Sequence, residues 1–444
     1  MSGRFLGKQW TSFQIITAGF LAVILIGALL LSLPVSSSSG EWTPLPDALF
    51  TAASAVCVTG LVIRDTATFW SYFGQAVILV LIQVGGLGIV TITALIAAAS
   101  GRKISLLQRS MLQESISAHQ LGGVVKLTGF VCRVALFTEL VGALLMMPAF
   151  CSAFGLPGIW MSVFHSVSAF CNAGFDVMGG HTGQFSSLTF FSSSLGVTLS
   201  VCFLIITGGI GFLTWDDAVK YKFRLKKYSM QSKVILTAAA LLVLVPAGVF
   251  FFNDFSELAL RERICVSLFQ AVTPRTAGFN TVDMARLTSA GRAMTVVLML
   301  IGGAPGSTAG GVKTTTAAVL LANAAAVVRR RKNPRLFSRR IGEDTVKSAS
   351  TLLILYLSLS LAGAFVISVA ERLPFEWCIF ETVSAIGTVG LSMGITPTLG
   401  LLSRAVLMGL MFFGRVGALT LLSAAVSTSR IETAQYPVGR INVG

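Results

Sequence analysis

Four glycines, each at the end of a short apolar run, are the residues of this chain best suited to chemistry. They stand at 60, 174, 278 and 390, so that 104 to 114 residues separate successive copies. Glycine adopts backbone angles that turn consecutive carbonyl oxygens the same way. Carbonyl oxygens arranged like this replace the hydration shell of a cation in selectivity filters. The pattern therefore predicts cation coordination by backbone atoms.

Each glycine closes a related phrase, and the three residues that end each phrase form the predicted filter. The copy at 388–390 reads Thr-Val-Gly, close to the start of the TVGYG filter of potassium channels, whereas the other copies are divergent. We therefore expect one strong central site and weaker selectivity than in a four-fold symmetric filter. The predicted filter residues are Val58, Thr59, Gly60, Asn172, Ala173, Gly174, Thr276, Ala277, Gly278, Thr388, Val389 and Gly390.

A second glycine phrase follows each filter glycine after 24 to 34 residues, at 85–88, 208–211, 302–304 and 414–417. A lone glycine in a membrane protein commonly serves close helix packing, and glycine-rich membrane sequence produces look-alikes. Two phrases that keep order and spacing four times indicate a repeat instead. A period above 100 residues is too long for a solenoid unit of roughly 20–50 residues. Four tandem modules are predicted.

The composition is that of an integral membrane protein. Hydrophobic residues make up 54% of the chain and charged residues 11%, with a mean hydropathy of +0.82, whereas soluble domains carry about 25% charged residues. The net charge of +15 does not indicate nucleic-acid binding, because 21 of the 33 Lys and Arg residues lie in connections between apolar spans. Those connections are 4–8, 102–109, 220–233, 329–347 and 430–440.

By the positive-inside rule these connections are cytoplasmic, and both termini lie inside a cell membrane crossed many times. Part of the basic surplus is available to anionic lipid. The seven cysteines form no CxxC pair and there are only three histidines, so no metal site of the Cys or His type is predicted.

Each module reads as a spanning helix, a half-helix too short to span, an extended loop and a second spanning helix. This predicts an all-α fold with eight spans and four modules around one pseudo-four-fold pore. The C-terminal, partially negative end of each half-helix would point at the pore. Spans are expected at 13–34, 70–99, 124–150, 187–214, 234–252, 290–328, 347–370 and 400–425, half-helices at 47–56, 159–170, 262–273 and 375–386, and modules at 1–100, 101–222, 223–340 and 341–444.

One stretch, residues 302–316, interrupts a 39-residue apolar segment. Its proline removes a backbone donor and its five glycines lower helix propensity, so we expect a helix broken by a loop. A nucleotide P-loop is disfavoured, because Val312 separates Gly311 from Lys313 and no strand precedes the stretch.

Arg415 is a charge within an apolar segment, where it costs about 2.5–3.5 kcal/mol on insertion scales. Such a residue faces a cavity or a partner. In the repeat frame it corresponds to Gly303, so both should face one axis. The alternative is a structural ion pair with Glu381 or Asp216.

On these phrases the sequence resembles the Trk, Ktr and HKT superfamily of K⁺ transporters over residues 13–444. Eight spans without an added N-terminal pair, and the tail at 436–444, are most similar to the KtrB type of membrane subunit. Glycine rather than serine at position 60 resembles the K⁺-selective members of the family, because serine at this position is the family's usual marker of Na⁺ preference. The resemblance implies a homodimer with one pore per protomer, K⁺ as the transported ion and no covalent cofactor. It also implies a cytosolic ring of RCK-type, KtrA-like subunits through which alone nucleotide acts.

The resemblance further implies that the interrupted stretch is a gate beneath the filter, with Arg415 as a barrier to cations. The residues given this role are Gly302, Gly303, Ala304, Pro305, Gly306, Ser307, Thr308, Ala309, Gly310, Gly311, Lys313 and Arg415. The predicted function is that of a K⁺-translocating pore subunit driven by the membrane potential.

Two other classes of function fit the sequence less well than a pore. An ion-coupled secondary cation transporter (Na⁺/K⁺ or H⁺/K⁺ symport) would use two matched broken helices in related halves, and only one clearly broken span is visible in the sequence. A membrane enzyme would need clustered acid, base or nucleophile groups at depth, which this composition does not offer. We therefore expect a protein that is not an enzyme.

Overall fold

The computed structural model describes residues 3–5, 8–99, 106–116 and 123–417. It is helical, with four long apolar helices that recur along the chain. They are α1 (Ser12–Ser32), α7 (Val124–Phe154), α12 (Met230–Asn253) and α16 (Glu343–Glu371). Each is long and apolar enough to cross a membrane. Hydroxyl residues begin two of them: Thr11 forms a capping box with Gln14, and Ser229 caps α12.

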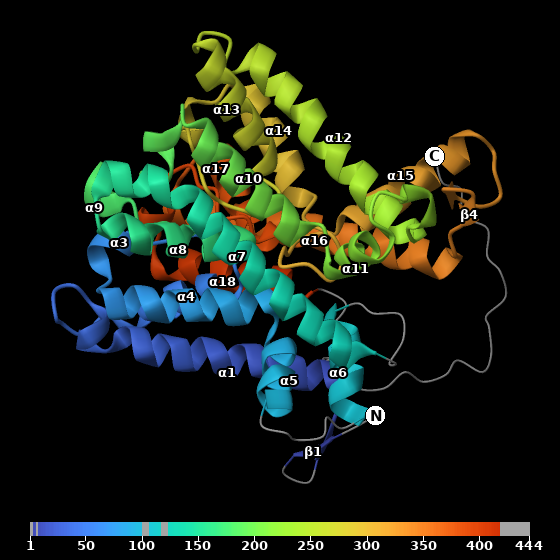
Figure 1. The fold of residues 1–444 in the computed structure, drawn as a ribbon, viewed down its shortest axis with the longest axis horizontal. Helices are drawn as coiled ribbons and strands as arrows, with labels where there is room; N and C mark the ends of the chain where they lie inside the picture. The colour runs from blue at the N-terminus through green and yellow to red at the C-terminus, as the bar shows by residue number, and fades with distance from the viewer. Residues whose placement is uncertain (1–2, 6–7, 100–105, 117–122, 418–444) are drawn as a thin grey trace.

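Each long helix is followed by a short helix that packs against it. The short helices are α2 (Leu45–Val56), α8 (Pro157–Phe170), α13 (Leu260–Val272) and α17 (Phe375–Gly387). In Figure 1 α8 and α17 lie inside the molecule, whereas α1 and α12 lie at its periphery. The aromatic residues Phe50, Phe164 and Phe380 of the short helices are 2% exposed or less. At 12 to 14 residues none of the four can span a bilayer.

The second helix is bent in the first two repeats and interrupted by a loop in the third, while in the fourth the described residues end at Gly417, directly after α18 (Leu401–Val416). Bent pairs are α4 (Tyr72–Leu87) with α5 (Ile89–Ala99), and α10 (Leu195–Gly209) with α11 (Phe212–Tyr221); α14 (Ser289–Leu300) and α15 (Thr314–Val328) are separated by a loop. Small elements are β1 (Gly3–Phe5), β2 (Lys8–Trp10), η1 (Pro34–Ser36), α3 (Thr66–Phe69), α6 (Leu106–Ile116), α9 (Gly179–Thr182), η2 (Thr189–Phe191), η3 (Leu225–Lys227), η4 (Met284–Arg286), β3 (Arg335–Leu336), β4 (Arg339–Arg340) and η5 (Thr396–Thr398).

The helices expected at 70–99 and 187–214 are each found as a bent pair. The two pairs bend by 97° and 99°. Gly88 and Gly211, at the breaks, have φ of +85° and +86° with ψ of 135° and 141°, a conformation available essentially to glycine alone. The bends also overturn the expectation of a single broken span. Within the described residues four helices, or six if each bent pair counts as one, pass as membrane spans, against eight predicted.

The bends explain why the second glycine phrase follows the first at a similar spacing in each repeat. A Cβ added to Gly85, Gly208 or Gly414 would lie only 2.8–3.0 Å from the carbonyl carbon of Val56, Phe170 or Ile386. These three carbonyl groups lie at the C-terminal ends of α2, α8 and α17. The first glycine of the phrase therefore lets the second helix approach the end of the short helix, and the last one turns the chain away.

The short helices also contact the second helix of the preceding repeat. The pairs in contact are α4 with α8, α10 with α13, α14 with α17 and, closing the series, α18 with α2. Contacts of this kind place the four short helices in a ring rather than a row.

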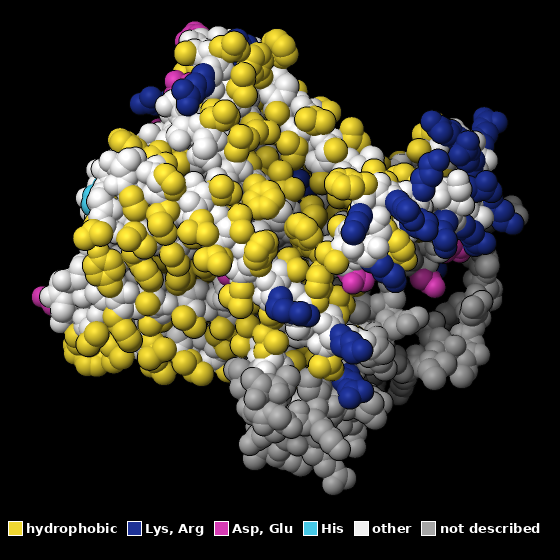
Figure 2. Space-filling model, viewed as in Figure 1, with side chains coloured by type: hydrophobic (Ala, Val, Ile, Leu, Met, Phe, Trp, Pro, Cys, Tyr) yellow, Lys and Arg dark blue, Asp and Glu magenta, His cyan; other side chains and the backbone are white. Residues whose placement is uncertain are grey.

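The surface separates apolar from basic regions. Hydrophobic side chains cover α1, α4 and α7, while Lys and Arg gather at the end that carries α11, α15, β3 and β4 (Figure 2). Helix α1 exposes Leu25 and Leu29 and buries Gly27 and Ala28. Large apolar side chains on the outside and small ones inside are typical of a helix that faces lipid. The structure is that of a helical protein of the multi-pass membrane type.

Candidate cation filter and intramembrane loop

The four predicted filter segments share one unusual backbone conformation. In each, the residue two before the glycine and the glycine itself have positive φ, and the residue between them does not. The glycine values run from +67° to +93° and the others from +52° to +78°: Val58, Asn172, Thr276 and Thr388. Positive φ is uncommon for non-glycine residues and gathers at functional sites. Alternation of this kind turns successive carbonyl oxygens to one side.

The four segments close into a ring in chain order. A Cβ added to Gly60 would lie 3.0 Å from the Cα of Gly174, and one added to Gly174 would lie 3.0 Å from the Cα of Gly278. The same construction joins Gly278 to Gly390 at 3.2 Å and Gly390 back to Gly60 at 3.0 Å. Each added Cβ would also collide with a carbonyl oxygen of the next segment. The structure thus brings all four predicted glycines together and leaves no room at any of them for a side chain.

Hydroxyl groups from the short helices hold the segments in place. The Ser54 hydroxyl accepts from the Gly60 amide at 3.1 Å, and the Ser384 hydroxyl accepts from the Gly390 amide at 3.0 Å. In the second segment Ser168 instead donates to the carbonyl of Phe175 at 2.8 Å. Each brace spans six or seven residues, so the segment conformation is tied to the end of its own helix.

Several side-chain oxygens in the ring are buried and have no partner among the described residues. They belong to Thr59, Asn172, Thr276 and Thr388. Buried polar atoms are normally hydrogen-bonded, so four such oxygens at one place suit an ion that would supply the missing contact. Oxygen donors without charge fit an alkali cation better than a soft or divalent metal.

Two cavities lie on opposite sides of the ring. The outer cavity, of about 200 Å³, is lined by all four filter glycines and by residues of the loops that follow them. The inner cavity has a volume of about 430 Å³. Its lining includes Gly86, Gly88, Gly306, Ser307, Ala309, Lys313 and Arg415. The helices α3 and α9 lie at the end of the molecule remote from α15 and β4 (Figure 1), and residues of the loops beside them, Val62, Asp176 and Phe185, line the outer cavity.

The interrupted helix places an intramembrane loop (residues 301–313) directly against the ring. Residues 314–316, predicted to belong to the loop, begin α15. The neck of the loop is closed, since the Gly302 amide donates to Val312 at 2.8 Å and the Thr314 amide to Gly303 at 3.0 Å. An added Cβ on Gly302 or Gly310 would lie 3.3 Å or less from side-chain atoms of the filter residues Thr276 or Thr388. The loop therefore lies between the ring and the inner cavity.

The tip of the loop is bonded to the second repeat. The Ala304 amide donates to Gly209 at 2.8 Å and the Phe212 amide to Gly306 at 2.8 Å. The Thr308 hydroxyl donates to the backbone carbonyl of Phe170 at 2.9 Å and accepts from the side-chain amide nitrogen of Asn172 at 2.8 Å. The loop is thus fixed both to the bend at Gly211 and to a filter residue.

Arg415 bridges three repeats from the inner cavity. Its guanidinium donates to the carbonyls of Thr308 and Gly85, and to Gly86 at 2.9 Å. None of the ion pairs in the described part of the chain includes it, and Glu381, offered above as its alternative partner, accepts from Ser392 and Thr396 instead. Lys313 likewise donates to a carbonyl, that of Ala309, at 2.7 Å. Arg415 and Lys313 therefore both line the inner cavity and form no ion pair within the described residues, although the carboxylate of Glu114 lines the same cavity.

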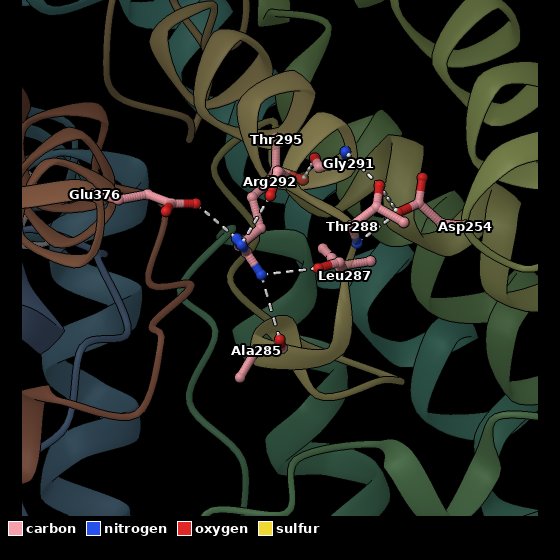
Figure 3. Close-up of polar contacts among 9 residues, drawn as sticks. Asp254, Ala285, Leu287, Thr288, Gly291, Arg292, Thr295 and Glu376 are labelled. Atoms are coloured by element: carbon pink, nitrogen blue, oxygen red, sulfur yellow. Dashed lines mark hydrogen bonds and ion pairs between the residues drawn. The ribbon is translucent and has the colours of Figure 1, made fainter. Parts of the chain in front are cut away.

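A set of contacts that the sequence did not reveal ties each repeat to the next at the outer end. Arg292, in the first turn of α14, donates to Glu376 of α17 at 2.8 Å and to the carbonyl of Leu287 at 2.9 Å (Figure 3). Arg404, at the equivalent place in α18, donates to Asp47 of α2 at 2.9 Å.

The other two contacts between neighbouring repeats are hydrogen bonds, one between two neutral side chains and one between a hydroxyl and a carboxylate. Trp160 of α8 donates to Gln75 of α4 at 2.8 Å, and Ser192, just before α10, donates to Glu262 of α13 at 2.9 Å. These four contacts, here called the outer girdle, hold the N-terminal end of every short helix. The repeat frame placed Gln75, Arg292 and Arg404 in register, which is the signal that could have identified them.

The two charged contacts of the girdle differ in burial, and we expect their removal to differ in effect. Asp47 has a side chain 8% exposed and pairs with both Arg64 and Arg404, whereas the side chain of Glu376 is 55% exposed. Asp47→Asn should destabilise the protein by about 3 kcal/mol because two arginines lose their buried counter-charge. Glu376→Gln, the matched control, should cost less than about 1 kcal/mol. Melting temperatures in detergent test this, and equal shifts would contradict it.

Comparisons with known proteins agree with the fold. Residues 8–432 match the TrkH family, described as a cation transport protein. Two relatives cover 98% of this chain and of their own length: the potassium/sodium uptake protein NtpJ of Enterococcus hirae, 41% identical, and the Ktr system potassium uptake protein B of Bacillus subtilis, 37% identical.

Among solved structures, the crystal structure of the potassium transporter TrkH from Vibrio parahaemolyticus superposes with a TM-score of 0.72 at 18% identity. It covers 93% of this chain and 85% of its own, and supports the fold. The resemblance predicted from the sequence is therefore confirmed: the chain belongs to the TrkH family of cation transport proteins, and it is a transporter rather than an enzyme.

Proposed function

We propose that this chain is the K⁺-translocating pore subunit of a potassium uptake system, with inward flux driven by the membrane potential. The observation that carries the proposal is the closure of four glycine segments into one ring between two cavities. Its four repeats form four helix–half-helix–helix modules around a pseudo-four-fold axis, with eight spans. Two relatives are named for potassium uptake, and one of those for sodium as well.

The filter selects by exchanging water for backbone oxygens. Each short helix ends at the ring and adds the partially negative end of its dipole. A cation at the ring therefore meets carbonyl oxygens and buried hydroxyl oxygens of Thr59, Thr276 and Thr388. A membrane potential of 100 mV supplies about 2.3 kcal/mol per charge for inward movement.

The intramembrane loop and Arg415 act as the gate below the filter. The loop fills the path between the ring and the inner cavity, and two basic side chains that form no ion pair within the described residues, Lys313 and Arg415, line that cavity. Transport requires the loop to move, and the hydrogen bonds that join its tip to the second repeat, made by Ala304, Gly306 and Thr308, must then break.

Regulation comes from a separate cytosolic, RCK-type subunit that binds nucleotide, and two copies of this chain form a homodimer in the membrane. The basic end of the chain, including Arg331, Arg335 and Arg340, is the face on which the regulatory subunit docks. With that end cytoplasmic, both termini lie inside, as the positive-inside rule requires.

An ion-coupled carrier is the second candidate, and the bent helices favour it more than the sequence did. Two matched bends, at Gly88 and Gly211, lie in the first two repeats. Carriers of this kind place such breaks in related halves around a midplane site. The ring of four segments, a feature of pores, keeps the channel-like mechanism first.

Cation uptake into proteoliposomes containing this chain alone decides between them. We expect K⁺ and Rb⁺ to enter faster than Na⁺ under an imposed negative-inside potential, without ATP and without a Na⁺ or H⁺ gradient. Uptake that needed an opposing or accompanying Na⁺ or H⁺ gradient would establish the carrier instead. If all uptake were absent and adding a cytosolic regulatory subunit did not restore it, the pore proposal would fail.

A further inference from the structure

The outer cavity carries a second ring of residues beside the glycines. The position two residues after each filter glycine lines this cavity: Val62, Asp176, Asn280 and Ser392. Because the four glycines close into one ring, these positions surround the entrance to it. Three of the four are polar, so a cation that approaches the glycines from this side passes between them.

Only two of the three polar residues have oxygens free for a ligand. The Ser392 hydroxyl donates to Glu381 at 2.6 Å and accepts from the Gly394 amide at 2.8 Å and the Thr396 hydroxyl at 3.1 Å. Asn280 uses its side-chain nitrogen to donate to Val282 at 3.2 Å and keeps its amide oxygen. Asp176 accepts from the Met178 amide at 3.1 Å through one oxygen.

The charge of Asp176 is not compensated by any residue that the structure describes. Neither of its oxygens is within ion-pair distance of a Lys or Arg, and its second oxygen accepts no hydrogen bond there. The neighbouring Asp65, by contrast, accepts from the amides of Ala67, Thr68 and Phe185. Asp283, in the same cavity, lies 3.8 Å from Arg286 and caps η4. Asp176 is the open carboxylate of the entrance.

We propose that Asp176, with the amide oxygen of Asn280, forms an outer cation-binding site that captures a hydrated alkali cation before the glycine ring dehydrates it. The inference rests on the proposed function, and it adds a site built from side chains to a filter built from backbone. A cleft of one charge sign raises the local concentration of counter-ions and their rate of entry by about 10–10³-fold. The site therefore sets the concentration at which uptake saturates.

Protons compete with the cation for this carboxylate. Burial, together with repulsion from Asp65, raises the pKa of Asp176 to about 7. Above this pH the site is charged and captures cations; below it the carboxyl is neutral. The other titratable group that lines the cavity is Asp283, which is acidic, and the imidazole of His181 on α9 packs on Phe154 outside the cavity lining. Acidification of the outer side from pH 8 to pH 6 should thus lower uptake at subsaturating K⁺.

Rb⁺ uptake into cells without other K⁺ uptake systems, normalised to the amount of protein in the membrane, tests the site. Asp176→Asn should raise KM about three- to tenfold, leave kcat unchanged and remove the dependence on outer pH. Asp176→Glu should restore both properties. Glu41→Gln, which removes an exposed carboxylate near the same end but outside the cavity, should match the wild type.

Several results would overturn the proposal. A wild-type KM in Asp176→Asn would do so, as would a loss of kcat alone, which indicates a structural role. So would a pH dependence that vanished in His181→Asn and survived in Asp176→Asn. Wild-type protein that took up no Rb⁺ at all would instead overturn the proposed function, and the outer site with it.

Discussion

Gly278→Ser should lower the permeability of K⁺ relative to Na⁺ by about tenfold, which corresponds to about 1.4 kcal/mol of lost discrimination. Gly278 has a φ of +79°, and an added Cβ would lie 3.2 Å from the Cα of both Gly174 and Gly390 and collide with the Val389 carbonyl. The serine must therefore push neighbouring segments apart. In a wider ring the backbone oxygens no longer replace every water of the K⁺ hydration shell. The selectivity for K⁺ over Na⁺ therefore falls.

The measurement is the ratio of Rb⁺ to Na⁺ uptake in proteoliposomes under one imposed potential. Gly40→Ser is the matched control, since Gly40 has a similar φ of +72° but nothing within 4 Å of an added Cβ. It imposes the same backbone strain, of about 1–2 kcal/mol, without crowding the ring. An unchanged ion ratio in Gly278→Ser, in protein that folds and inserts, would remove this glycine from the filter.

Deletion of residues 306–310 should increase K⁺ flux about tenfold and make it independent of any regulatory subunit. An increase of this size needs the barrier to fall by only about 1.4 kcal/mol. The deletion removes Thr308, which joins the loop to Phe170 and Asn172 and accepts from Arg415. The neck survives, because Gly302 and Val312 are already hydrogen-bonded to each other. The shortened loop can therefore close without dragging α14 or α15 from the helix bundle.

Point variants distinguish a gating role of the loop from a structural role. Thr308→Val removes the hydroxyl that contacts the filter residue Asn172, and Arg415→Gln removes the charge that faces the inner cavity. Both should raise flux in the same direction as the deletion. Ser307→Ala, whose hydroxyl bonds only within the loop, to Ala304 at 2.7 Å, should leave flux unchanged. Flux that disappeared in correctly inserted deletion protein would show that the loop is structural.

The sequence by itself determined the short helices and the conformation of the segments that follow them. The half-helix predicted at 47–56 is Leu45–Val56, and the one at 375–386 is Phe375–Gly387. A ten-residue apolar run that ends in glycine cannot span a membrane, so length and composition suffice for this prediction. The interruption at 302–316 was visible for the same reason, because proline and five glycines act locally on helix propensity.

The tertiary structure decided everything that depends on which segments meet. The bends at Gly88 and Gly211 were missed, since a glycine in an apolar helix serves packing as readily as a break. The acceptors of Arg415 come from residues 85, 86 and 308, and the partner of Arg404 is Asp47, 357 positions away. Side-chain type fixes what a residue can bind, but the closure of four repeats into a ring fixes what it reaches. The outer entrance with Asp176 exists only because that ring closes.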